Sequence, residues 1–213
     1  MSNKNLAIED SISFKCYKEK VLEDYRLLSL SRECSILGRR EVMTGKAKFG
    51  IFGDGKELPQ LILSKFFKDG DFRSGYYRDQ TILMEQGHLT PQHLFSALYA
   101  HPDKDIEPMS GGRQMGGHFV TKSNEPNGAW KNLTKQKNHS SDISPTAGQI
   151  PRLIGLAQAS KVYRALKIKG SERFSYDGNE IAWGTIGNAS TSEGLFLEAM
   201  NAAGVMQIPM VMS

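Results

Sequence analysis

The sequence predicts an α/β domain in which helices flank a parallel sheet, preceded by a helical amino-terminal segment. Two stretches, Ile181 to Ile186 and Ile208 to Met212, are apolar without polar alternation, as is typical of buried parallel strands. A segment with helical periodicity separates them, so this part of the chain is expected to form a strand–turn–helix–strand unit. The chain upstream contains several further helical segments, which are expected to pack around the sheet.

The turn of this unit, residues 187–190, consists of small residues at the carboxyl end of the first strand. Thr191 or Ser192 is expected to cap a helix that begins near Glu193 and ends at Gly204. One face of that helix carries Leu195, Ala199, Ala202 and Ala203. Parallel sheets bind anions at such turns, where backbone N–H groups and a helix amino end converge.

The elements before this unit are mostly helical. Residues 1–12 are polar and expected to be loose. Residues 13–38 predict a long amphipathic helix with Tyr17, Val21, Tyr25, Leu28 and Ile36 near one stripe. Shorter helices are expected over residues 57–68, 79–86, 90–100 and 151–166. In the third of these, Thr90 is expected to cap the helix and Pro91 to occupy its first position. Residues 101–146 show little periodicity, which is typical of a functional or disordered stretch, and 168–178 form a polar loop.

Composition limits the classes of function. The 213 residues are 39% hydrophobic and 23% charged, with a net charge of +4, so a globular chain is expected and nucleic-acid binding is not. Cys16 and Cys34 lie too far apart in one helix to bridge, which favours free thiols in a reducing compartment. The sequence has neither a signal peptide nor an apolar run of about 18 residues, so we expect no membrane span and a cytoplasmic location.

The end of the chain is unusual, because Ser213 directly follows an apolar strand. A domain seldom stops on such a strand, so we expect either a longer native polypeptide or a second chain that completes the sheet.

Three short motifs carry candidate binding residues. Tyr76, Tyr77, Arg78 and Asp79 follow a glycine in an expected turn, where Arg78 either grips a phosphate or pairs with Asp79 on the surface. Residues 111–118 form a glycine-rich loop with Arg113 and His118 that either approaches a ligand or is merely flexible. Residues 144–151 precede a helix, where hydroxyl and N–H groups bind an anion or simply cap. Histidine spacing suggests no zinc site, and no serine-hydrolase elbow is present.

In this order, the motifs resemble the alpha part of the thiamine-diphosphate-dependent 2-oxo acid dehydrogenases, from about residue 49 to residue 213. The matching segments are Gly55-Lys56-Glu57, Tyr77-Arg78, Gly112-Arg113-Gln114-Met115 with His118, Ser144-Pro145, Gln149-Ile150-Pro151, residues 187–194 and Asn201-Ala202-Ala203. The Gly-Arg-Gln-Met loop is similar to that of the branched-chain, 2-oxoisovalerate type. The resemblance thus implies a thiamine diphosphate-binding fold over residues 49–213, apparently cut before the motif ends, with residues 1–48 as the helical segment.

The resemblance also implies roles for individual residues. It places Tyr77, Arg78, Ser144, Thr146, Gly187, Asn188, Ala189 and Ser190 against thiamine diphosphate, Asn188 on Mg²⁺, and Tyr76, Gln114 and His118 on the substrate side. Three positions depart from the family: Asn188 stands for an acidic metal ligand, Ala189 for a glycine and Thr146 for a leucine. The closing metal ligand, a histidine-bearing loop and the beta part with its glutamate are not present, so we expect an alpha–beta fusion or a separate beta chain.

The activity that the resemblance implies is oxidative decarboxylation of a branched-chain 2-oxo acid, with acyl transfer to the lipoyl domain of a dihydrolipoyl acyltransferase. The enzyme would be an oligomer in a multienzyme complex of branched-chain amino acid degradation. The alternatives are a pyruvate or acetoin dehydrogenase alpha portion, and a catalytically inert fragment or assembly module. A Rossmann-type nucleotide binder is disfavoured because Gly-x-Gly-x-x-Gly does not follow the first strand.

Overall fold

A computed structural model describes residues 13–213 of the chain. Its centre is a parallel sheet of four strands, β1 (Phe72–Tyr76), β2 (Asn138–Ile143), β3 (Ala182–Gly184) and β4 (Met210–Met212), in the order β2-β1-β3-β4. The expected strands at 181–186 and 208–212 are therefore confirmed, although both are shorter than predicted. The expected polar stretch at 1–12 lies outside the described residues.

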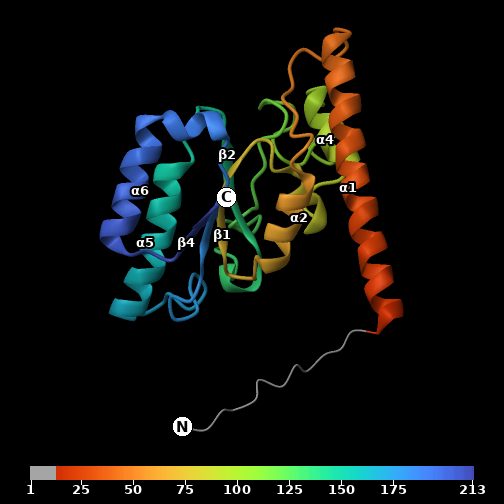
Figure 1. Cartoon of the computed structure of the whole chain (residues 1–213). Coiled ribbons are helices and arrows are strands. Elements are labelled where there is room, and N and C mark those ends of the chain that lie inside the picture. The colour runs from red at the N-terminus through yellow and green to blue at the C-terminus, as the bar shows by residue number, and fades with distance from the viewer. Residues whose placement is uncertain (1–12) are drawn as a thin grey trace.

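Helices cover both faces of the sheet (Figure 1). On one face lie α5 (Ile150–Leu166) and α6 (Gly194–Met206), and on the other lie α1 (Phe14–Met43), α2 (Glu57–Phe66), α3 (Gln80–Glu85) and α4 (Pro91–Leu98). Two short 3₁₀ turns, η1 (Leu133–Lys135) and η2 (Asn188–Ser192), complete the regular structure. The parallel sheet between helices confirms the α/β class. None of the helices in residues 13–213 is both long and apolar enough to cross a membrane.

Apolar clusters lie on both faces of the sheet. Leu153 and Ala157 of α5 pack against Ala182 of β3. A Cβ atom at Gly184 would lie only 2.4 Å from Leu153 Cδ2, so the close approach requires glycine there. On the opposite face, Trp183 packs with residues of α2 and α3.

Helix α1 differs from the expected amphipathic pattern. The predicted stripe is wrong as an inward face, because Tyr17, Val21, Tyr25 and Ile36 are exposed. The buried side is instead small and polar, with Ser31, Cys34, Ser35 and Gly38. Gln80 of α3 donates from Nε2 to the Ser31 carbonyl at 2.8 Å and to the Ser35 hydroxyl at 2.9 Å, and the Ser31 and Thr81 hydroxyls lie 2.8 Å apart. Hydrogen bonds to α3 therefore supplement the apolar contacts that Cys34 and Leu27 make along this side.

Several element ends also differ from prediction. Thr90 caps α4 as expected, accepting from His93 N at 3.1 Å. Thr191 and Ser192 do not cap α6, because their hydroxyls donate back to carbonyls inside η2, and Glu193 stands at the N-cap without a side-chain bond. Helix α6 also passes through Gly204 and ends at Met206, where Gln207 takes the left-handed conformation.

Two strands were not predicted. The stretch expected to be a turn around Gly75 and Tyr76 is β1, the centre of the sheet, and β2 lies inside the apparently irregular residues 101–146. Both strands contain charged residues, so neither shows the apolar run that identified β3 and β4.

Candidate functional site

The carboxyl ends of the parallel strands meet at one edge of the sheet, and the sequence motifs lie there. Tyr77-Arg78 follows β1, Ser144 follows β2, and the Gly187 turn follows β3. This edge is where α/β sheets bind ligands, because the turns between strands and helices present unpaired backbone groups.

Arg78 stands in a cavity of about 210 Å³ at this edge. The cavity is lined by Lys56, Gln60, Tyr76, Arg78, Asp79 and Gly187, among others. The Arg78 guanidinium lies 4.7 Å from the centre of the Tyr76 ring and donates to the Tyr76 hydroxyl. Its Nε is buried and has no hydrogen-bond partner among the described residues. Arg78 therefore lines this cavity and has one buried donor that is unpaired within residues 13–213.

The turn after β3 lies against this guanidinium. A Cβ atom built on Gly187 would lie 3.6 Å from Arg78 Nη2 and 3.7 Å from the Ser190 hydroxyl. Glycine keeps this approach open, so an anion held by Arg78 can also come close to the turn backbone. The cationic side chain and the turn form an anion-binding arrangement.

A second cavity, of about 180 Å³, adjoins Tyr77. Its lining is mostly apolar, with Phe49, Ile51 and Met115, and includes His118 and Ser144. The His118 and Tyr77 rings stack with centroids 6.2 Å apart, and His118 Nε2 contacts the Ser144 hydroxyl. His118 Nδ1 lies 2.9 Å from the Met115 carbonyl. The structure thus brings Tyr77, His118 and Ser144 together.

Other residues singled out in the sequence lie apart from these cavities. Thr146, Gln114, Asn188 and Ala189 are exposed and line neither cavity, whereas Ser190 is buried beside Gly187. The surface pair of Arg78 with Asp79, the alternative interpretation, is wrong because Asp79 is buried and bonds elsewhere.

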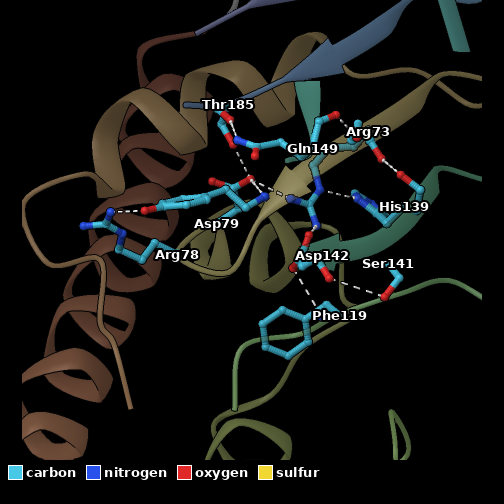
Figure 2. Close-up of polar contacts among 12 residues, drawn as sticks. Arg73, Arg78, Asp79, Phe119, His139, Ser141, Asp142, Gln149 and Thr185 are labelled. Atoms are coloured by element: carbon cyan, nitrogen blue, oxygen red, sulfur yellow. Dashed lines mark hydrogen bonds and ion pairs between the residues drawn. The ribbon is translucent and has the colours of Figure 1, made fainter. Parts of the chain in front are cut away.

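Behind the site lies a buried charged cluster that sequence reasoning missed (Figure 2). Arg73 is completely buried and donates from Nη1 to Asp79 at 2.6 Å, from Nη2 to Asp142 at 2.7 Å and from Nε to His139 Nδ1 at 2.8 Å. His139 Nε2 lies 2.6 Å from Gln86 Oε1. The charged groups of this cluster are therefore paired with opposite charges and hydrogen-bonded, as buried charges must be.

Electrostatics in this cluster follow from burial. Burial, and then the nearby positive charge of Arg73, hold the pKa of His139 well below its usual value, so its imidazole is neutral and accepts the Arg73 Nε–H. Burial raises the pKa of Asp142 to about 6, against the opposing effect of Arg73. The only sequence signal for this cluster was the occurrence of Arg, His and Asp within stretches flanked by glycine or serine.

Comparison with known proteins identifies the family. The sequence model of the dehydrogenase E1 component family matches residues 26–213. The chain belongs to this family. The resemblance inferred from the sequence is thereby confirmed, and the structure is that of an E1 component chain.

Related E1 proteins carry a more specific name. The 2-oxoisovalerate dehydrogenase subunit alpha of Bacillus subtilis is 27% identical over 198 residues, covering 91% of this chain and 50% of that protein. The mitochondrial subunit alpha of Caenorhabditis elegans is 25% identical over 78% of this chain and 32% of the relative, and that of Homo sapiens is 25% identical over 91% and 37%. The chain spans about half the length, or less, of the relatives that it matches.

Asn188, the expected magnesium ligand, is the first residue of η2. Asn188 is exposed, and its amide oxygen carries no charge to attract a hard cation. Within residues 13–213, no three His, Cys, Asp or Glu side chains gather where they would hold a metal ion.

Proposed function

We propose that this chain is the cofactor-diphosphate-binding alpha portion of a thiamine-diphosphate-dependent 2-oxo acid dehydrogenase. The observation that carries the proposal is Arg78, which lines the cavity with its Nη2 beside the Gly187 turn and whose buried Nε has no hydrogen-bond partner among residues 13–213. A guanidinium binds phosphate oxygens with paired N–H groups, and the open backbone at Gly187 supplies further donors. Family membership agrees with this assignment, since residues 26–213 match the E1 family.

Each residue at the site has a defined task in this proposal. Arg78 neutralises diphosphate charge, and the Tyr76 hydroxyl orients its guanidinium. Tyr76 therefore acts on the diphosphate side, not on the substrate side. Tyr77, His118 and Ser144 line the adjoining apolar cavity, which would receive the reacting 2-oxo acid. When bound, thiamine diphosphate supplies the electron sink that permits loss of carbon dioxide.

The finer assignments rest on the names of the relatives and on the apolar cavity. We propose a branched-chain 2-oxo acid as substrate, because Phe49, Ile51 and Met115 offer an apolar surface to an aliphatic side chain. We further propose a beta part, in a partner chain or fused, and a lipoyl domain of the acyltransferase as acyl acceptor. The division of the chain at residues 48/49 and the cytoplasmic location stay predictions.

A second candidate is a module that binds its partner chain without binding cofactor. The neutral, exposed Asn188 at the expected metal position favours this alternative. The two candidates differ in whether the chain itself has affinity for thiamine diphosphate.

Calorimetric titration of thiamine diphosphate, with and without Mg²⁺, distinguishes them. We expect binding by the parent chain and at least about tenfold weaker binding by Arg78→Ala, since removing one charge-assisted hydrogen bond costs about 1.5–3 kcal/mol. The control is Arg26→Ala, which removes an equal charge from an exposed position on α1. Absence of binding by the parent chain would favour the cofactor-free module, and equal affinity in Arg78→Ala would contradict the assigned grip.

A further inference from the structure

The two carboxylates that bind Arg73 also bond to the walls of the candidate site. Asp79 directly follows Arg78, and its Oδ2 accepts three hydrogen bonds. Besides Arg73 Nη1, the donors are Tyr76 N at 3.1 Å and the Thr185 hydroxyl. Thr185 lies between β3 and the Gly187 turn. One oxygen atom therefore links the segment that carries Arg78 to the segment that carries Gly187.

Asp142 has the corresponding place at the second cavity. Its Oδ1 accepts from Arg73 Nη2, and its Oδ2 accepts from the backbone N–H of Phe119 at 3.2 Å. Phe119 follows His118 directly, and Asp142 lies shortly before Ser144 in the chain. This carboxylate therefore fixes the loop that presents His118 next to the strand end that presents Ser144, as Figure 2 shows for its bonds to Arg73 and Phe119.

Stability alone is a weak reason for such a cluster. Burying one cation with two carboxylates carries a large desolvation cost, and apolar residues of similar volume often give equal or greater stability. Hydrogen bonds between charged groups do, however, define directions and distances that apolar packing leaves adjustable. The Thr185 carbonyl is held as well, by Gln149 Nε2 at 2.8 Å. The cluster thus restrains backbone segments on both sides of the site.

We propose that Arg73 is a positioning residue of the cofactor site. Through Asp79 it sets the Arg78 guanidinium relative to the Gly187 turn, and through Asp142 it sets His118 relative to Ser144. Arg73 contacts no ligand in this assignment, and the ligand named in its test, thiamine diphosphate, rests on the function proposed above.

The first test changes Thr185, because substituting it leaves Arg73 and both carboxylates in place. Thr185 also lines the Arg78 cavity, so hydrogen exchange of the ligand-free chain is needed to separate lost positioning from a lost ligand contact. Thr185→Val keeps the shape of the side chain but removes the hydroxyl that bonds Asp79, whereas Thr185→Ser retains the hydroxyl. We expect Thr185→Val to weaken thiamine diphosphate binding by about tenfold, and Thr185→Ser to bind within about twofold of the parent.

A matched control separates positioning from general loosening. Ser175 is also buried, and its hydroxyl donates to the Glu180 carboxylate at 2.7 Å in the loop before β3, at the opposite end of that strand from Thr185. Ser175→Ala therefore removes a comparable bond away from the site and from the Arg73 cluster. Equal weakening of cofactor binding by Ser175→Ala and Thr185→Val would overturn the proposal, as would unchanged binding in Thr185→Val.

Hydrogen exchange of the ligand-free chain tests the same proposal without cofactor. Thr185→Val should speed amide exchange in residues 76–79 and 186–190 but not in residues 117–120. Asp142→Asn should show the opposite pattern, and Arg73→Lys, which keeps the charge but cannot bridge both carboxylates, should loosen both segments. Unchanged exchange near Gly187 in Thr185→Val would overturn the proposal even if Arg73→Lys failed to fold.

The two proposals fail in different ways. If the parent chain does not bind thiamine diphosphate, the proposed function fails while exchange still reports on the role of Arg73. If Arg78→Ala abolishes binding but Thr185→Val changes neither binding nor exchange, the diphosphate grip stands and the positioning role is wrong.

Discussion

Arg73 and Arg78 stand at the two ends of one short segment, yet their surroundings differ. Arg73 is completely buried, and its donors are taken by two aspartates and a histidine. Arg78 lines a cavity, contacts tyrosine rings and has a buried Nε without a partner in the described part of the chain. The charge of Arg73 is balanced by the protein itself, whereas that of Arg78 is available to a ligand. What distinguishes the structural Arg73 from the candidate binding residue Arg78 is whether its donors have hydrogen-bond partners, not how deeply it is buried.

The glycines next to these arginines show the same contrast. A Cβ atom on Gly75 would lie 1.3 Å from Arg73 Nη1, so the guanidinium occupies the space that glycine leaves. A Cβ atom on Gly187 would meet nothing closer than 3.6 Å. Gly75 makes room for the protein's own side chain, and Gly187 leaves room beside the cavity.

Substituting the two arginines should give the largest difference in the free energy of unfolding. Arg73→Met leaves Asp79 and Asp142 buried without a counter-charge, so we expect the free energy of unfolding to fall by roughly 3–5 kcal/mol. Arg78→Ala should lower it by less than about 1 kcal/mol. Urea unfolding followed by circular dichroism measures both values. The reference variant is Arg39→Ala, which removes a surface ion pair with Asp54. Similar losses for Arg73→Met and Arg39→Ala would show that the buried cluster contributes little.

The glycine pair should give a smaller and more specific difference. Gly75→Ala forces a side chain into the Arg73 guanidinium, and overpacking of this kind costs about 1–3 kcal/mol. Gly187→Ala should leave unfolding nearly unchanged while it weakens thiamine diphosphate binding, because the methyl group projects between Arg78 and the turn. Denaturant unfolding and calorimetry on both variants measure the two effects. A stable Gly75→Ala protein would mean that Arg73 readily adopts another position.

Acid should weaken the Arg73 region by a smaller amount. The folded pKa of His139 is lowered by burial and by Arg73, while in the unfolded chain it titrates near 6.5. Protons therefore bind the unfolded state preferentially below that pH, and stability is lost as pH falls, by up to about 1.4 kcal/mol per pH unit.

Two neighbouring groups modify this pH dependence. His88, whose pKa is also lowered by burial, adds to the acid loss. Asp142 acts in the opposite sense, because its folded pKa of about 6 lies above its unfolded value, so acid between about pH 6 and 4 favours the folded state. Unfolding curves at pH 7.5, 6.5 and 5.5 should show falling stability, and His139→Gln should reduce the slope. An unchanged slope in that variant would exclude His139 as its source.

Sequence reasoning recovered the elements whose pattern is local. Strands β3 and β4 have apolar runs, α4 has its Thr90 cap, and Arg78, His118 and Ser144 stand in recognisable motifs. Strands β1 and β2 were missed because their polar residues, such as Arg73, His139 and Asp142, are satisfied by one another across the sheet and by partners in other segments. No pattern within either segment shows that pairing.

The inward face of α1 was missed for a similar reason. Ser31 and Ser35 are buried because Gln80 and Thr81 of α3 bond to them, and these partners lie far along the chain. The end of α6 was also unpredictable, since Gln207 adopts the left-handed conformation that glycine usually takes. Thr146 and Gln114 followed from motif order, yet both side chains are exposed.

The central position of β1 has a consequence for how the chain folds. Its neighbours in the sheet come much later in the sequence: Arg73 bonds to His139 across 66 residues, and Asp71 bonds to Trp183 across 112. Such non-local contacts must close long loops before they yield stabilisation, which slows folding. During synthesis, β1 leaves the ribosome long before β3. Until β3 emerges, the Arg73 side chain and at least one edge of β1 lack their partners. Nascent chains should therefore depend on chaperones until about residue 185 has emerged.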